Sequence, residues 1–254
     1  MNSKSPLFEL AVATQFLTRL PVARDLDPTP EDLGRSTLYF PLIGLGVGAL
    51  IALTANAALA LGLPTGVAIV LALTLGVLVT GALHEDGLSD AADGLGGGWT
   101  REESLNIMRD SRIGNYGAVA LVLLFALRIA ALSEIAPSQW LGALAVAHAL
   151  GRWSSVDLLV RVPYARNPDD APGLGKNYGD TLPEGALVRA TIMTALFAVA
   201  FLGVDGLLAL VLAAAVSRLS GRYYQRKIGG ITGDTLGATN VLCEVAVLMF
   251  VAAG

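Results

Sequence analysis

Charged side chains are scarce in this chain. Only 15% of its 254 residues are charged, whereas 54% are hydrophobic and the mean hydropathy is +0.63. A soluble domain carries about a quarter charged residues, so this composition argues against one. The alternative, a soluble helical protein with a large core, has too few polar segments here to coat such a core. Composition therefore predicts an all-α, polytopic transmembrane helical bundle that forms a single integral membrane domain over residues 1–254.

Other common signatures are also missing. The single cysteine, Cys243, excludes a disulfide framework. Lys and Arg are spread over loops and form no basic stripe, so nucleic acid is not an expected partner. We expect no cleavable signal peptide, because the opening residues lack an apolar segment that ends at a small-residue cleavage site. None of these features determines the oligomeric state.

The apolar runs predict about seven spans, since a helix needs roughly 20 residues to cross a bilayer. The predicted spans are residues 36–61, 63–83, 114–136, 138–160, 186–204, 205–219 and 235–253. The segment 7–20 is apolar on one side and too short to span, so we expect an N-terminal helix at the membrane interface.

The positive charges divide cleanly between the two sides of this arrangement. Apart from Arg128, Arg152, Arg189 and Arg218, which lie within or at the ends of spans, all Lys and Arg fall in the N-terminal segment and in the loops at 84–113, 161–185 and 220–234. The three turns on the other side contain none. Because basic loops face the cytoplasm, the N-terminus and the large loops are predicted to be cytoplasmic and the C-terminus to lie outside. The 161–185 loop is rich in Pro and Gly and is expected to be irregular.

An acidic motif, HEDGLSDAADGLGGG, follows the second span at residues 84–98. On a helix, Asp86, Asp90 and Asp93 would fall within about 60° of arc. Like charges repel at that spacing unless a cation lies between them, and oxygen ligands suit Mg²⁺ better than zinc. We therefore expect a cytoplasmic extension of the second span that holds a metal ion on these three carboxylates. A solvated acidic helix face is the alternative.

Glycines and a histidine flank these carboxylates. The helix is expected to stop at Gly94, with glycines 96–98 leaving room for a bulky ligand. His84 is expected to be an interfacial residue without a chemical role, and its alternative is a metal ligand or a hydrogen-bond donor to phosphate.

Two arginines in the same cytoplasmic loop are candidates for binding phosphate. Arg109 and Arg112 lie three residues apart, and Arg grips phosphate with two parallel hydrogen bonds. Their alternative role is that of topology anchors, which is the only role expected for Arg101.

A second motif, RKIGGITGDTLGATNVLCE, runs from Arg226 to Glu244. Its glycines, Gly230 among them, precede a helix whose free N–H groups could receive an anion. Lys227 adds a positive charge, and Asn240 and Glu244 are neighbours on the last span, where an acid is a functional candidate. We expect this motif to form the second wall of a phosphate pocket. Arg152 and Asp157 in the fourth span either contact substrate or form structural ion pairs.

Carboxylates, a divalent cation and arginines on one membrane face fit group transfer at a pyrophosphate. The metal would neutralise charge on the phosphates, and a carboxylate would accept the proton of an attacking hydroxyl. The candidate catalytic acids are Glu85, Asp86, Asp90 and Asp234, with either Glu85 or Asp234 as the base.

Six segments together resemble the cobalamin synthase (adenosylcobinamide-GDP ribazoletransferase) family. They are FLTRLPV (16–22), YFPLIG (39–44), HEDGLSDAADGLGGG (84–98), MRDSRIGNYG (108–117), GRW (151–153) and GGITGDTLGATNVLCE (229–244). The resemblance implies an inner-membrane enzyme of the last steps of cobalamin assembly. It would join adenosylcobinamide-GDP to α-ribazole or its 5′-phosphate and release GMP, with Mg²⁺ as cofactor. It also implies that Glu85, Asp86, Asp90 and Asp93 form the metal and phosphate site.

Two alternatives remain. A CDP-alcohol phosphotransferase would carry a DxxDGxxAR motif, whose arginine is missing here. A cation-coupled transporter would use Arg152, Asp157 and Glu244 along a midplane path. It would need polar access from both faces, whereas the acids of this chain concentrate at one face.

Overall fold

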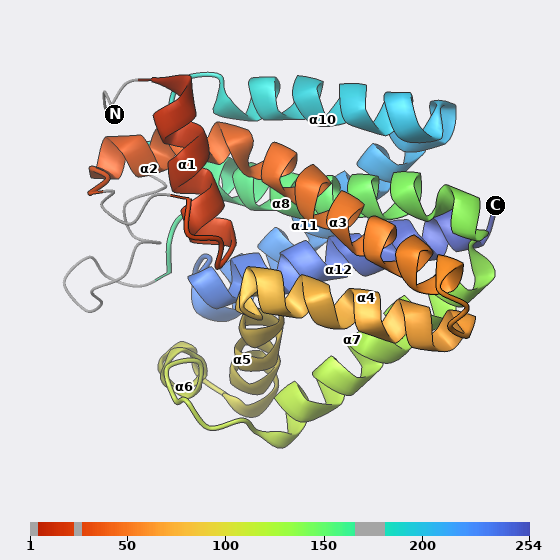
Figure 1. Cartoon of the computed structure of the whole chain (residues 1–254). Coiled ribbons are helices and arrows are strands. Elements are labelled where there is room, and N and C mark those ends of the chain that lie inside the picture. Colours follow the sequence, from red (N-terminus) through yellow and green to blue (C-terminus); the bar gives the residue numbers. More distant parts are fainter. Residues whose placement is uncertain (1–4, 23–26, 166–180) are drawn as a thin grey trace.

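The computed structural model describes residues 5–22, 27–165 and 181–254, and these form an all-α bundle (Figure 1). The long helices are α3 (Phe40–Ala60), α4 (Thr65–Thr80), α7 (Asn115–Glu134), α8 (Trp140–Arg161), α10 (Ala186–Leu202), α11 (Val204–Ile228) and α12 (Gly233–Ala252). The shorter helices are α1 (Pro6–Leu17), α2 (Pro30–Ser36), α5 (Leu83–Gly97) and α6 (Arg101–Ile107). An isolated bridge, Tyr164 to Ile231, is the β-type pairing of the described residues. The all-α prediction is therefore confirmed.

Several of these helices have the length and apolar character of membrane spans. Four described segments qualify: α2 with α3, α7, α11 and α12. The bent pair α4 and α5 would make a fifth, and α10 is a shorter apolar helix. These helices indicate a membrane protein. Each of the seven predicted spans is helical, but the count of seven is not confirmed by length and composition.

The central helix α8 explains part of this difference. Every residue from Ala143 to Leu159 is buried, because α3, α10, α11 and α12 pack around the helix. Its polar side chains are thereby shielded from lipid, so α8 need not be as apolar as a lipid-facing span. It lies close to α3, since a Cβ on Gly48 would be 2.2 Å from the Leu144 carbonyl oxygen. Small residues allow such close approach between membrane helices.

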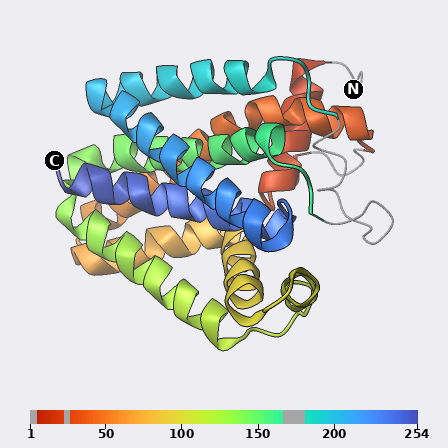
Figure 2. The ribbon, with the colours of Figure 1, turned by 180° about the vertical axis from the view of Figure 1, so that it is seen from behind.

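The connections separate into two groups at opposite ends of the bundle. The short turns α3–α4, α7–α8 and α10–α11 lie at one end, where the C-terminus also lies (Figures 1 and 2). The other end carries α1, α2 and the turn between α11 and α12. This alternation matches the predicted one, while the orientation in the membrane stays a prediction. Most of the predicted irregular 161–185 loop lies outside the described residues.

The acidic motif departs from the prediction at a sharp bend. Gly81 (φ 65°) and Ala82 (φ 59°) both adopt the left-handed conformation, and α5 leaves α4 at 87°. The acidic helix is therefore not a straight extension of the second span. It also does not stop at Gly94. There α6 packs so closely that a Cβ would be 2.4 Å from Met108 Cγ, and the helix continues to Gly97.

The predicted sixth span is also longer than expected. It was predicted to end at Leu219, but α11 continues to Ile228, where Gly229 (φ 81°) ends it. Most of the predicted 220–234 loop is therefore helical.

Candidate active site

The two glycine-and-acid motifs lie against one another. Helix α5 crosses the first turns of α12, and a Cβ on Gly87 would be 2.9 Å from the Asp234 carbonyl oxygen. A Cβ on Gly237 would be 3.3 Å from the Cα of His84. Glycine at both positions lets the two backbones meet. Residues some 150 positions apart in the sequence are thereby brought to one place.

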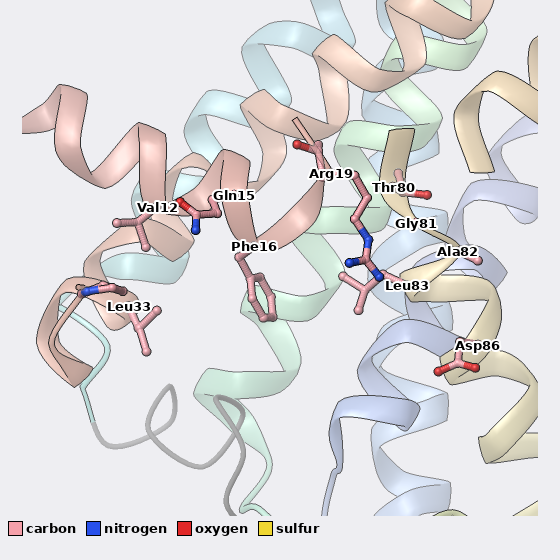
Figure 3. A pocket seen from close by; sticks show the side chains of 12 residues that line it. Val12, Gln15, Phe16, Arg19, Leu33, Thr80, Gly81, Ala82, Leu83 and Asp86 are labelled. Carbon is pink, nitrogen blue, oxygen red and sulfur yellow. The ribbon is translucent and has the colours of Figure 1, made fainter. Parts of the chain in front are cut away.

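A pocket of about 640 Å³ opens beside the α4–α5 bend (Figure 3). Its walls come from α1, the segment after it, Leu33 and the bend itself. The lining residues are Val12, Gln15, Phe16, Thr18, Arg19, Pro28, Leu33, Thr80, Gly81, Ala82, Leu83 and Asp86. Asp86 is thus the acid of the motif that faces this pocket. The Arg19 side chain lies across Gly81, where a Cβ would be 2.2 Å from Arg19 Nε.

The three predicted metal ligands differ in their surroundings. Asp86 is exposed, Asp90 is half-buried and Asp93 is buried. Asp93 accepts hydrogen bonds from the backbone N–H groups of Gly114 (2.7 Å) and Gly117 (2.9 Å). A carboxylate at a helix N-terminus is stabilising, so Asp93 fixes the start of α7. Within the described ranges, no three or more His, Cys, Asp or Glu side chains converge as a metal site.

Glu85 belongs to a buried ion cluster on the other side of α5. Arg128 of α7 donates to Glu85 at 2.8 Å and also to Glu244 of α12. Both Arg128 (3% exposed) and Glu244 (1% exposed) are buried. Buried charges are costly unless they are paired and hydrogen-bonded, which is the case here. The first turn of the acidic helix is therefore anchored to two other helices.

The same cluster holds two predicted substrate contacts. Arg152 of α8 donates to Glu244 and, at 3.3 Å, to Asn240. His148 Nδ1 lies 3.0 Å from Glu244, and His84 Nδ1 lies 3.5 Å from Arg152. His84 is therefore buried in the cluster and not at an interface. These groups pair with one another, and Asp157 instead accepts from Arg161 and Ser217. This closed cluster of ion pairs fits a structural role better than the midplane path that a transporter would need.

The basic candidates are dispersed over the polar end of the bundle. Arg109 is exposed, and Arg112, 86% exposed, pairs with Asp110 at 2.6 Å. Hydrogen bonds from Arg112 lower the pKa of Asp110 to about 2. Lys227 donates to the Gly98 carbonyl at 2.8 Å and so joins α11 to the end of α5.

The remaining second-motif residues shape the start of α12. A Cβ on Gly230 would be 2.2 Å from the Pro163 carbonyl oxygen, so glycine is needed for the backbone pairing there. The Thr232 hydroxyl caps α12 and donates to Asp234 at 3.2 Å. Asp234 is half-buried.

Three residues of this region were missed as candidates. Arg128 was the one basic residue inside the predicted third span, and a charge at such a position is a functional candidate by default. Arg19 belonged to a quoted motif, but nothing local linked it to Gly81. Arg101, expected only as a topology anchor, donates to the carbonyls of Ile228 (2.9 Å) and Ala165 (2.5 Å).

Comparison with known proteins agrees with this arrangement of motifs. The family model described as cobalamin-5-phosphate synthase matches residues 9–252. An adenosylcobinamide-GDP ribazoletransferase of Shewanella pealeana is 42% identical over 89% of this chain and 88% of its own. Proteins of the same name from Roseiflexus sp. (41%, over 96% and 88%) and Bradyrhizobium diazoefficiens (40%, over 98% and 95%) are similarly close. No solved structure matches. The match spans nearly the whole chain, and the chain belongs to the cobalamin-5-phosphate synthase family.

Proposed function

We propose that this protein is an adenosylcobinamide-GDP ribazoletransferase of cobalamin biosynthesis. It joins adenosylcobinamide-GDP to α-ribazole, or to its 5′-phosphate, and releases GMP. The observation that carries the proposal is the similarity of about 40% over nearly the full length of relatives that bear this name. The contact between α5 and α12 supports it, because it gathers carboxylates, a helix N-terminus and a lysine in one region.

Mg²⁺ is the cofactor that the donor groups suit. Mg²⁺ is usually held by one or two carboxylates together with substrate phosphates, and seldom by an all-protein cage. Asp86 and Asp90 lie one helical turn apart, and Asp86 opens to the pocket. Both are therefore proposed as ligands. Asp93 accepts hydrogen bonds from two backbone N–H groups at the start of α7 and so orients α7 beside Asp86 and Asp90. The bound ion would neutralise charge on the pyrophosphate.

The reaction needs one P–O bond formed and one broken. The hydroxyl of α-ribazole attacks the phosphorus bound to the corrinoid side chain, and the bond from that phosphorus to GMP breaks. Asp234 is the better candidate for the base that accepts the hydroxyl proton, because Glu85 is held by Arg128. Arg109, Arg112 and Lys227 are proposed to offset phosphate charge, as exposed or multidentate donors at this end of the bundle.

The membrane is proposed to be the cell inner membrane, with the site on the cytoplasmic side. Most Lys and Arg of the chain lie in the segments predicted to be cytoplasmic, and the acidic motif belongs to one of these segments. Both a nucleotide substrate and a nucleotide product would then be on the side where nucleotides are metabolised.

The test is conversion by the purified protein in lipid vesicles. With adenosylcobinamide-GDP, α-ribazole and Mg²⁺, we expect GMP and completed corrinoid in equal amounts. GMP that forms without α-ribazole would indicate a hydrolase. Transfer of a substrate across the vesicle without conversion would indicate a transporter, and either result would contradict the proposal.

A further inference from the structure

We infer that the pocket beside the α4–α5 bend binds the acceptor, with the aromatic base against α1 and the ribose toward Asp86. The inference rests on the proposed function and specifies where one of its two substrates binds.

The walls of the pocket differ from one side to the other. Val12 and Leu33 lie on the side of α1 and α2, while Thr80 and Asp86 lie on the opposite side (Figure 3). Phe16 projects between them and stacks on Phe40, with ring centroids 5.7 Å apart and planes at 14°. Aromatic walls favour a flat aromatic ligand, and polar groups fix its orientation. A nucleoside has this division, with an aromatic base at one end and hydroxyl groups at the other.

The size of the pocket selects the smaller substrate. Pockets of roughly 300–1,000 Å³ enclose drug-sized molecules, and this one measures about 640 Å³. A nucleoside fits that volume. Adenosylcobinamide-GDP contains a corrin ring and two nucleoside groups, so it is several times larger and must remain largely outside. Since Asp86 is exposed, the donor can reach it from outside the pocket.

The charge of the pocket points the same way. Among its described lining residues, Arg19 and Asp86 are the ionisable side chains, and their charges cancel. The diphosphate of the donor is proposed to meet the metal ion at Asp86, so the rest of the pocket, whose one described charged side chain is Arg19, is left for the nucleoside. The base against Phe16 then directs the ribose toward Asp86, where the phosphorus to be attacked would be held.

The experiment fills the pocket with a larger side chain and leaves the acidic residues unchanged. Leu83 lines it and is 39% exposed, so Leu83→Trp places an indole in the space for the acceptor. Phe16→Leu removes the aromatic wall and keeps an apolar side chain. The matched control is Leu71→Trp on α4, which is 46% exposed and lies outside the pocket. Steady-state kinetics in vesicles are measured for both substrates, with binding of radiolabelled α-ribazole in detergent as a readout independent of turnover.

We expect Leu83→Trp to raise the KM for α-ribazole about tenfold or more and to weaken its binding, with the KM for adenosylcobinamide-GDP unchanged. Phe16→Leu should act in the same direction with a smaller effect, and Leu71→Trp should behave as wild type. An equal rise in both KM values, or a rise only for adenosylcobinamide-GDP, would overturn the inference while the proposed function stands. A wild-type protein that neither binds α-ribazole nor forms product would overturn both.

Discussion

Arg128 bridges Glu85 and Glu244, so one guanidinium on α7 joins the first turn of α5 to the middle of α12. Glu85 directly precedes Asp86, which faces the pocket on the other side of α5. The direction in which Asp86 points is therefore tied to an ion pair buried behind it.

This relationship predicts that Arg128→Met lowers the stability of the protein and that a second substitution, Glu85→Gln, restores much of it. Removing one partner of a buried ion pair costs about 3–5 kcal/mol, because the other charge is left unpaired. Thermal unfolding in detergent should show a lower Tm for Arg128→Met, with reduced kcat. The double variant Glu85→Gln with Arg128→Met should regain much of the Tm, since Glu244 keeps Arg152.

The single variant Glu85→Gln separates anchoring from catalysis. If it abolishes kcat at an unchanged Tm, and the double variant is equally inactive, then Glu85 is the base and not an anchor.

Asp90 and Asp93 should respond differently to loss of charge. Asp90→Asn is expected to raise the Mg²⁺ concentration needed for half-maximal activity, because a proposed ligand loses its charge. Asp93→Asn weakens the hydrogen bonds to Gly114 and Gly117 and should cost about 1–2 kcal/mol of stability at unchanged Mg²⁺ dependence. Activity is titrated with Mg²⁺ and unfolding is followed by temperature. A shift in Mg²⁺ dependence for Asp93→Asn alone would assign the metal to Asp93.

Packing between α3 and α8 gives a test with an internal control. A Cβ on Gly48 would be 2.2 Å from the Leu144 carbonyl oxygen, whereas nothing lies within 4 Å of a Cβ on Gly46. Gly48→Ala should therefore lower the yield of folded protein and its Tm. Gly46→Ala should be neutral or stabilise by up to about 1 kcal/mol, because Ala favours helix. Equal Tm values for the two variants would contradict the close approach.

The pair formed by Asp110 and Arg112 should not contribute to pH dependence near neutrality. The pKa of Asp110 is lowered from 3.8 to about 2, so the stabilisation is complete above the unfolded value and is lost as the pH falls through about 2. Asp110→Asn should leave the shape of the activity profile unchanged between about pH 5 and pH 9. A changed profile, recorded with the wild type in parallel, would mean that Asp110 titrates in the working range.

Much of the fold was predictable, because bilayer thickness and helix geometry leave a strong pattern in the sequence. The apolar runs predicted the helices, and the turns without Lys or Arg predicted which connections lie together at one end of the bundle. The bend at Gly81 and Ala82 was not predictable, since an alanine adopts φ 59° there, a conformation that favours glycine. For the same reason the acidic face was expected on a straight extension.

Only those features of the candidate site that depend on neighbouring residues in the sequence were predictable. The spacing of Asp86 and Asp90 follows from helical geometry and needs no partner. The partners of Glu85 and Asp93 lie 43, 21 and 24 residues away, and one sequence carries no signal for such pairings. The contact of Gly87 with Asp234 was expected only in outline, as two walls of one pocket.

Glu244 of α12 receives both Arg128 of α7 and Arg152 of α8, and both arginines precede it in the chain. Until α12 inserts, two arginines in the earlier helices have no counter-charge from it. The buried arginines of α7 and α8 are therefore fully paired only when α12 packs against both helices, so insertion of α12 is expected to be coupled to the docking of these two helices.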